Sequence, residues 1–273
     1  MHHIHQGDAF KILPTLEKES IDLCFTSPPY NVGKEYDLNL PEDEYIQWCK
    51  DWMKLIPPLL KDTGVFVLNI GDKVTKVERS TRIPELWLYA VKELGLHYIE
   101  LYIWNKGKML PIRSNYRATN VYEPCIWFSK SKRFRFYREE VRRPYNPISI
   151  KRMEYKIKKR WARDPNNPVK EYKEWAPNPA GALPKNILDI GSEFGNKVHP
   201  AVFPRRLAEW FIKASTLPGQ MVLDPFLGAG TSMVASAGLG RSSTGIELEP
   251  RYVDLSYDRL KEAGYEAEIY YAH

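Results

Sequence analysis

The sequence predicts an α/β fold, a doubly wound, Rossmann-like and mostly parallel sheet, interrupted by one basic, loop-rich insertion. Short apolar strands alternate with amphipathic helices along most of the 273 residues, as is typical of a parallel sheet covered by helices on both faces. A glycine-bearing turn follows an apolar strand late in the chain, as in nucleotide-binding α/β folds. We therefore expect a main domain of residues 1–130 and 186–273, with an insertion of residues 131–185.

Each expected element rests on a local pattern. Alternation around Ile4 predicts an N-terminal strand, and apolar runs predict strands over residues 21–25, 64–70, 98–104, 122–129, 221–224 and 243–247. Helical spacing of apolar residues predicts helices over residues 45–60, 84–94, 207–215 and 231–237. In the first of these helices Trp48, Trp52 and Leu55 share one face, and Pro57-Pro58 interrupts it.

Composition restricts the class of protein. Hydrophobic residues make up 43% of the chain and aromatic residues 13%, as in a globular protein. The sequence has no run of about eighteen uncharged apolar residues, and the N-terminus lacks the apolar core of a signal peptide. The three cysteines, Cys24, Cys49 and Cys125, are widely spaced and indicate neither a disulfide framework nor a zinc site. We expect a cytoplasmic protein without a membrane partner or a metal.

The segment Ser27-Pro28-Pro29-Tyr30 follows directly after the apolar strand of residues 21–25. Its prolines fix two φ angles, remove two N–H donors and favour an extended Ser27. The Ser27 hydroxyl and the carbonyls of Ser27 and Pro28 remain as acceptors beside the ring of Tyr30. Such an arc suits a planar group that carries an NH2, although a Pro-Pro turn alone is as often an ordinary turn.

A second motif begins with the strand of residues 221–224 and continues through Asp224, Pro225, Phe226, Gly228, Gly230 and Thr231. Glycines allow a ligand to approach the backbone closely, and the first turn of the following helix has free N–H groups. The next strand ends in Glu247, roughly twenty residues after the turn, where doubly wound folds place a carboxylate that binds ribose. The order of turn, strand and acid indicates a cofactor that contains adenosine.

Together the two motifs resemble those of the DNA amino-methyltransferases, which use S-adenosylmethionine. In that family Asp/Asn/Ser-Pro-Pro-Tyr/Phe is the catalytic motif and Asp-Pro-Phe-x-Gly-x-Gly-Thr is the cofactor motif. Residues 27–30 and 224–231 match them, with the catalytic motif first, as in the permuted beta class. The resemblance covers nearly the whole chain.

The resemblance implies roles for particular residues. Ser27, Pro28, Pro29 and Tyr30 would form the catalytic motif. The segment Gly7-Asp8-Ala9 resembles the part that contacts the adenine of the cofactor, and the pairs His199-Pro200 and Phe203-Pro204 resemble the element that leads into the cofactor strand. The cofactor-binding residues expected in this way are Asp8, Ala9, His199, Asp224, Pro225, Phe226, Gly228, Gly230, Thr231 and Glu247.

The chemistry explains why such a loop is needed. The amino nitrogen of cytosine or adenine is a poor nucleophile because its lone pair is delocalised into the ring. Acceptors aimed at both amine hydrogens favour a pyramidal nitrogen whose lone pair faces the methyl group. We assign this orienting role to Ser27 and the Pro28 carbonyl, and we expect Tyr30 to stack on a base that has left the duplex.

The insertion is basic. Residues 130–163 contain fourteen Lys or Arg and three acidic residues, with aromatic side chains between them, whereas the whole chain has a net charge of +6. A solvated surface is the simpler interpretation of a basic run alone. Beside a base-modifying motif, recognition of double-stranded DNA is the better one. The expected DNA-binding residues are Lys132, Arg133, Arg135, Arg142, Arg143, Lys158, Lys159 and Arg160.

Other residues fit an ordinary structural role better. Cys125 follows a proline, as does the nucleophile of carbon-5 cytosine methyltransferases, but it lies within an apolar strand and is expected to be buried and inert. The histidines at positions 2, 3 and 5 suit a strand better than a metal site. Residues 69–72 either line the pocket or form a simple turn.

The target base and the partners follow from the resemblance. Ser-Pro-Pro is associated with the 4-amino group of cytosine and Asp-Pro-Pro with the 6-amino group of adenine, so we favour cytosine, with adenine as the alternative. An RNA or protein-glutamine methyltransferase and a catalytically silent DNA-binding module are less favoured. We expect the modification enzyme of a restriction–modification system, prokaryotic, cytoplasmic and associated with the nucleoid, acting as a monomer or homodimer alongside a cognate endonuclease.

Overall fold

A computed structural model describes residues 1–33, 38–75, 77–107, 111, 114–154, 178–191 and 203–271. The chain divides into two compact units, the first formed by Met1–Tyr137 and Asn186–His273, and the second by Arg138–Lys185. In the second unit the chain pairs at Arg143 and Ala182 and contains helix α4 (Pro147–Glu154). Within the described residues no helix is long and apolar enough to cross a membrane.

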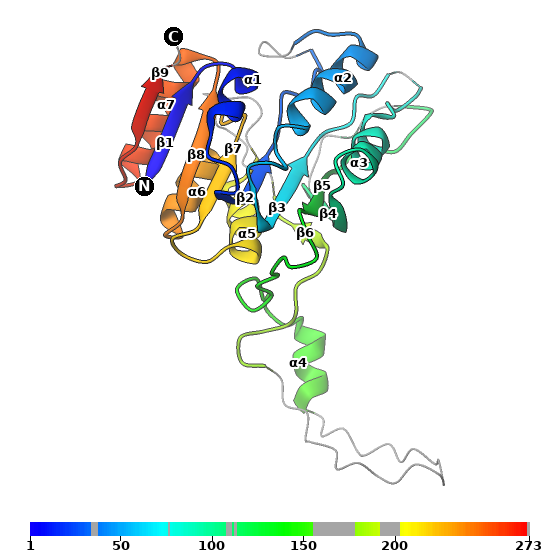
Figure 1. Ribbon diagram of the computed structural model, residues 1–273. Coiled ribbons are helices and arrows are strands. Elements are labelled where there is room, and N and C mark those ends of the chain that lie inside the picture. The colour runs from blue at the N-terminus through cyan, green and yellow to red at the C-terminus, as the bar shows by residue number, and fades with distance from the viewer. Residues whose placement is uncertain are drawn as a thin grey trace. The chain divides into compact units, whose positions relative to one another are not determined.

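The first unit is built on a sheet of nine strands within the described residues, in the order β6-β4-β5-β3-β2-β7-β8-β1-β9 (Figure 1). The strands are β1 (His2–Gln6), β2 (Ile21–Thr26), β3 (Leu60–Asn69), β4 (His97–Asn105), β5 (Tyr122–Ser129), β6 (Ile187–Asp189), β7 (Met221–Asp224), β8 (Ser242–Glu247) and β9 (Glu268–Tyr271). Strand β5 runs antiparallel to both of its neighbours, and the other described pairings are parallel. The expected mostly parallel, doubly wound sheet is confirmed.

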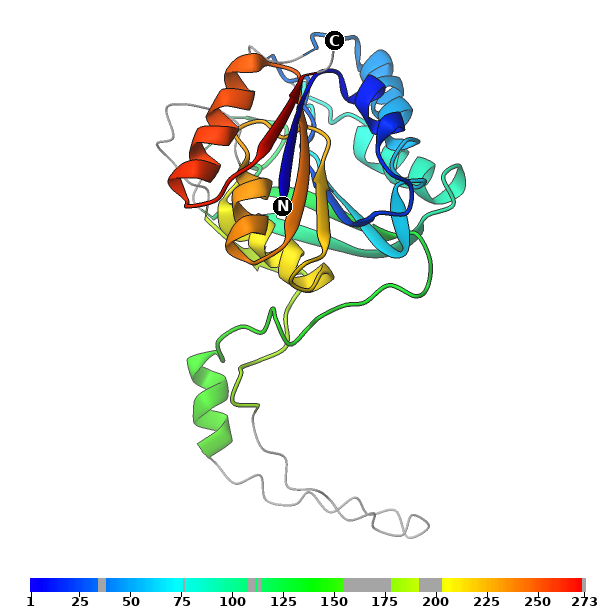
Figure 2. The ribbon, with the colours of Figure 1, turned by 60° about the vertical axis from the view of Figure 1, so that its left-hand side comes forward.

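Helices cover both faces of this sheet (Figure 2). Helices α1 (Ala9–Ile12), α2 (Glu42–Met53) and α3 (Arg82–Lys92) pack on one face, where Trp52, Phe66 and Leu86 belong to the larger apolar core. Helices α5 (Arg205–Ser215), α6 (Thr231–Gly238) and α7 (Pro250–Glu262) pack on the other. Buried apolar side chains on both faces explain why the central strands are almost continuously apolar.

The helix predicted over residues 45–60 is shorter than expected. Helix α2 begins at Glu42 and ends at Met53, and residue 60 already belongs to β3. Three acidic residues occupy its first turn, where they interact favourably with the helix dipole. Pro57 and Pro58 are incompatible with a helix interior, so residues 54–59 form turns instead. Helices α1, α4 and α7 and strands β6 and β9 were not predicted.

Connection order determines where a ligand can enter. The connection from β2 to β3 runs through α2 on one face, whereas that from β7 to β8 runs through α6 on the opposite face. Since β2 and β7 are parallel neighbours, the chain leaves their carboxyl ends in opposite directions. Such a switch point opens a crevice at the carboxyl edge of the sheet.

Candidate active site at the carboxyl edge of the sheet

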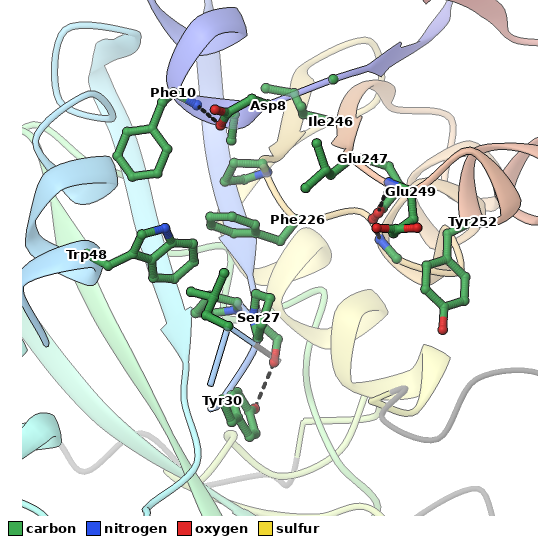
Figure 3. A pocket seen from close by; sticks show the side chains of 18 residues that line it. Asp8, Phe10, Ser27, Tyr30, Trp48, Phe226, Ile246, Glu247, Glu249 and Tyr252 are labelled. Carbon is green, nitrogen blue, oxygen red and sulfur yellow. Dashed lines mark hydrogen bonds between the residues drawn. The ribbon is translucent and has the colours of Figure 1, made fainter. Parts of the chain in front are cut away.

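A cavity of about 370 Å³ lies at this edge, beyond the carboxyl ends of β1, β2, β7 and β8 (Figure 3). This volume is within the range of small-molecule sites, roughly 300–1,000 Å³. Four segments that are far apart in the sequence form it, together with Leu38 and with side chains from α2 and α7. The lining residues are Gly7, Asp8, Ala9, Phe10, Ser27, Pro28, Pro29, Tyr30, Leu38, Trp48, Pro225, Phe226, Gly228, Ile246, Glu247, Leu248, Glu249 and Tyr252.

The two sequence motifs are joined beneath the cavity by Asp224. Its carboxylate accepts hydrogen bonds from Thr26 Oγ1 at 2.7 Å, Ser232 Oγ at 2.6 Å and the Phe226 amide at 3.1 Å. Burial raises the pKa of Asp224 to about 7, and the three hydrogen bonds oppose the shift. Asp224 therefore holds the end of β2 against the glycine turn, and it does not line the cavity.

The glycine turn adopts backbone conformations that favour glycine. Gly228 and Gly230 have φ values of 52° and 73°, and a Cβ on Gly230 would lie 2.7 Å from Ser256 Cβ. The Gly228 amide donates to Glu247 Oε2 at 2.8 Å, and the Glu249 amide donates to Glu247 Oε1 at 2.9 Å. Glu247 thus closes the turn against β8. Burial raises its pKa despite these hydrogen bonds.

Asp8 lies at the opposite side of the cavity from the Ser27 loop (Figure 3). It caps helix α1, because its Oδ1 accepts a hydrogen bond from the Phe10 amide at 2.9 Å. The Gly7 amide donates to the Glu247 carbonyl at 2.9 Å, which ties the end of β1 to the end of β8. Three acidic residues, Asp8, Glu247 and Glu249, therefore line one cavity with apolar walls.

The loop of residues 27–30 is held from several directions. Pro28 is buried, and the Pro29 carbonyl accepts a hydrogen bond from Tyr45 Oη at 2.7 Å. The fully buried Arg82 donates to the Tyr30 carbonyl and forms a bidentate ion pair with Glu42. Ser27 Oγ lies 2.7 Å from Tyr30 Oη. The positions of these acceptors are thus fixed before a substrate arrives.

The ring of Tyr30 packs against the backbone of Gly71, two residues after the end of β3. A Cβ at Gly71 would lie 2.6 Å from Tyr30 Cδ2, so a larger residue there would displace the ring. The predicted stacking of Tyr30 on a base stays a prediction. None of residues 69–72 lines the cavity, but Gly71 supports the ring of Tyr30, which does line it.

The structure brings most of the expected site residues together. All four residues of the Ser-Pro-Pro-Tyr motif line the cavity with Asp8, Ala9, Pro225, Phe226, Gly228 and Glu247. Asp224, Gly230 and Thr231 lie beneath it, where they shape the turn and the start of α6. His199 lies outside the described residues.

Several of the expected DNA-binding residues lie far from the cavity. Because β5 is antiparallel, the segment after it returns to the edge where the parallel strands begin, and Arg133 Nε pairs there with Asp62 Oδ2 at 2.8 Å. The eight residues of β5, at roughly 3.3 Å each, separate this edge from the cavity by about 25 Å. Lys132 and Arg135 belong to the same segment.

The remaining expected DNA-binding residues fall in or near the second unit. Arg142 pairs with Glu139 and donates to the Gly181 carbonyl, and Arg143 donates to the Leu183 carbonyl. These hydrogen bonds hold together the base of the insertion. Lys158, Lys159 and Arg160 lie outside the described residues. The role of the insertion in DNA recognition stays a prediction.

Seven lining residues were missed by sequence reasoning: Phe10, Leu38, Trp48, Ile246, Leu248, Glu249 and Tyr252. Trp48 was assigned only to a helix face, although its ring lies 5.4 Å from that of Phe226. The residues around Glu247 could have been found from their position at a strand end. No local pattern indicates that the rings of Phe10 and Tyr252 reach the same cavity.

Cys125 is buried, and burial raises its pKa well above its ordinary value, so the thiolate needed of a nucleophile is disfavoured. His2 Nδ1 lies 2.8 Å from Ser243 Oγ, and the ring of His5 stacks on Tyr270 at 4.8 Å. The described residues include no cluster of three or more His, Cys, Asp or Glu side chains arranged to hold a metal.

Residues 21–258 match the N6_N4_Mtase family, described as DNA methylase, and the chain belongs to this family. The type II methyltransferase M.ScaI from Streptomyces caespitosus is 30% identical over 269 residues, covering 94% of this chain and 81% of the relative. M.PvuII from Proteus hauseri is 28% identical over 276 residues, covering 93% of this chain and 82% of the relative.

Solved structures share the fold. The PvuII DNA methyltransferase, described as cytosine-N4-specific, has a TM-score of 0.72 at 22% identity and covers 98% of this chain and 94% of that chain. TTHA0409 from Thermus thermophilus, complexed with S-adenosyl-L-methionine, has a TM-score of 0.71 at 24% identity and covers 100% of this chain and 99% of that chain.

Membership in the DNA methylase family makes DNA the substrate rather than RNA or protein.

The raised pKa of Asp224 predicts a pH-dependent stability. Its pKa is about 7 in the folded protein, against about 3.9 in an unfolded chain, so the folded state binds this proton more tightly. Raising the pH through this window therefore destabilises the wild type. The isosteric Asp224→Asn removes the effect, so the free energy of unfolding of the variant, relative to wild type, should rise by a few kcal/mol between about pH 4.5 and about pH 7.5.

Urea unfolding at several pH values measures this difference. Asp51→Asn is the matched control. Asp51 is partly exposed and paired with Lys54, which lowers its pKa, so Asp51 titrates below the window. The free energy of unfolding of Asp51→Asn, relative to wild type, should therefore stay constant across it. Parallel stability curves for wild type and Asp224→Asn would contradict the prediction.

Proposed function

We propose that this DNA methyltransferase transfers the methyl group of S-adenosylmethionine to the 4-amino group of cytosine. The observation that carries the choice of base is the neutral hydroxyl of Ser27 at the first position of the loop, rather than a carboxylate. Adenine's ring draws more electron density from its amine, so a carboxylate acceptor helps that amine more. The PvuII enzyme, which has this fold and is described as cytosine-N4-specific, supports the choice.

The cavity fits S-adenosylmethionine by the chemistry of its lining. Apolar walls that include Phe226 and Ile246 suit a flat adenine, and the carboxylates of Asp8 and Glu247 suit ribose hydroxyls and an ammonium group. When bound, this cofactor supplies a methyl group on a positively charged sulfur. The glycine turn allows the close backbone approach that such a ligand requires.

The Ser27 loop would orient the target amine. The base has to leave the duplex to reach the carboxyl edge of the sheet. Ser27 Oγ and the Pro28 carbonyl then accept the amine hydrogens, which directs the nitrogen lone pair towards the methyl group. Since the loop is already held by Tyr45 and Arg82, little reorganisation accompanies the reaction.

The biological setting is proposed from the relatives, which are named type II methyltransferases. We propose that this chain is a modification enzyme and that a cognate restriction endonuclease acts on the same DNA sequence.

Product analysis tests the target base. After incubation of the enzyme with DNA and cofactor, the DNA is digested to nucleosides and these are separated by mass. We expect a peak at N4-methyldeoxycytidine in the wild type and its near absence in Ser27→Ala. A product peak only at N6-methyldeoxyadenosine would refute the choice of cytosine and leave the family and the cofactor site unaffected.

Cofactor affinity tests Glu247. Glu247→Ala should weaken binding of S-adenosylmethionine by roughly 1–3 kcal/mol, because charged hydrogen bonds are lost, whereas DNA affinity without cofactor should change little. Isothermal calorimetry measures the effect, with thermal unfolding as a check of the fold. Glu262→Ala, an exposed glutamate at the end of α7, is the control. Equal cofactor affinities in the two variants would show that Glu247 is not a cofactor residue.

Salt dependence of DNA binding tests which basic residues neutralise phosphates. Replacing Lys158, Lys159 and Arg160 by Gln should reduce the slope of log affinity against log salt by about 0.9 for each phosphate that is no longer neutralised. Replacing Lys132, Arg133 and Arg135 should leave the slope unaltered, because they lie at the edge opposite to the cavity. The reverse result would place the DNA on that opposite edge.

A further inference from the structure

A polar cluster lies behind the Ser27 loop and consists of Ser27, Tyr30, Asn69, Lys106 and Glu123; we call it the tyrosine cluster. Tyr30 Oη is at its centre, 2.7 Å from Ser27 Oγ and 3.1 Å from both Asn69 Oδ1 and Glu123 Oε2. The sheet register brings these residues together: Asn69 ends β3 and pairs with Cys125 of β5, two positions after Glu123.

Two of these side chains have a fixed orientation. The fully buried Asn69 donates from Nδ2 to the Pro124 carbonyl at 3.1 Å and to Glu123 Oε2 at 3.4 Å, so its Oδ1 is the atom that faces Tyr30. Lys106 Nζ pairs with Glu123 Oε1. The other carboxylate oxygen of Glu123 therefore faces the Tyr30 hydroxyl.

Tyr30 has a single hydroxyl hydrogen, and this determines which residue donates in the hydrogen bond between Ser27 and Tyr30. Burial, with Glu123 nearby, raises the pKa of Tyr30 well above its ordinary value, so its hydroxyl keeps its single hydrogen. Asn69 Oδ1 is an acceptor only, and Glu123 pairs with Lys106 through its other carboxylate oxygen, so Tyr30 donates towards both. The hydrogen in the 2.7 Å contact then has to come from Ser27.

This direction matters for the chemistry. A free serine hydroxyl can rotate and donate its hydrogen to the lone pair of the amine, the same lone pair that has to attack the methyl group. With its hydrogen held by Tyr30, Ser27 presents only lone pairs to the amine.

We propose that Glu123 is a positioning residue, which acts through Tyr30 to hold the Ser27 hydroxyl as an acceptor for the target amine. The inference rests on the proposed transfer to a base amine and applies equally to cytosine and adenine. Asn69 and Lys106 support it by fixing which atoms of the tyrosine cluster face Tyr30.

Glu123→Gln weakens the contact between Ser27 and Tyr30. The amide oxygen pairs with Lys106 and the amide nitrogen donates to Tyr30 Oη, whose hydrogen stays on Asn69 Oδ1. Because this new donor competes for the lone pairs of Tyr30 Oη, the Ser27 hydrogen is released and can turn towards the amine. We expect kcat to fall roughly 10- to 100-fold, while KM for DNA and the Kd of S-adenosylmethionine stay within about twofold. Glu100→Gln, on the neighbouring strand β4 and outside the tyrosine cluster, is the matched control and should keep wild-type kcat.

A double-mutant cycle separates positioning from a general structural effect. Tyr30→Phe removes the hydroxyl through which Glu123 acts, so adding Glu123→Gln to it should cause no further fall in kcat. Thermal unfolding and cofactor binding verify that each variant is folded.

Wild-type kcat in Glu123→Gln would overturn the inference, as would losses that multiply in the double variant. A wild type that transfers no methyl group to DNA would instead contradict the proposed function, and the inference with it. Methyl transfer by the wild type together with an unimpaired Glu123→Gln contradicts the inference alone.

Discussion

The hydrogen bond between Thr26 and Asp224 joins the two halves of the sheet at the point where the site is built. Thr26 ends β2 and precedes the Ser27 loop, and Asp224 ends β7 and precedes the glycine turn. A third partner, Ser232, ties the same carboxylate to α6. Because these groups are buried, breaking the hydrogen bonds between them would leave polar atoms without partners, which is costly. The hydrogen bonds therefore hold the Ser27 loop and the glycine turn in one relative position.

Rigidity on the acceptor side follows from the same principle. The prolines limit the backbone of the Ser27 loop, and Arg82, buried over the ring of Tyr45, holds its last carbonyl. A buried guanidinium needs a charge partner, which Glu42 supplies from α2. Helices α2 and α3, which carry Glu42, Tyr45 and Arg82, therefore hold the Ser27 loop in place. The acceptors of this loop need no rearrangement when a base arrives.

Strand direction decides which surface is near the chemistry. The parallel strands bring four loops to one edge, and the antiparallel β5 contributes Glu123 to that edge while it carries the basic segment after it to the other. The same reversal explains both the added acceptor behind Tyr30 and the distant position of Arg133. Strand direction, and not the local sequence, therefore decides how far this basic segment lies from the cavity.

The sequence alone determined seven of the nine described strands, helices α2, α3, α5 and α6 and the two motifs, because apolar periodicity and proline or glycine signals act over a few residues. It also placed Gly228 and Glu247 in one site through the order of turn, strand and acid, and the family resemblance added Ser27 to that site. Only the tertiary structure decided that Asp224 lies beneath the cavity, that Trp48 and Tyr252 line it, and that Glu123 faces Tyr30. Those contacts join residues distant in sequence, and they depend on strand order and direction, which no local pattern encodes.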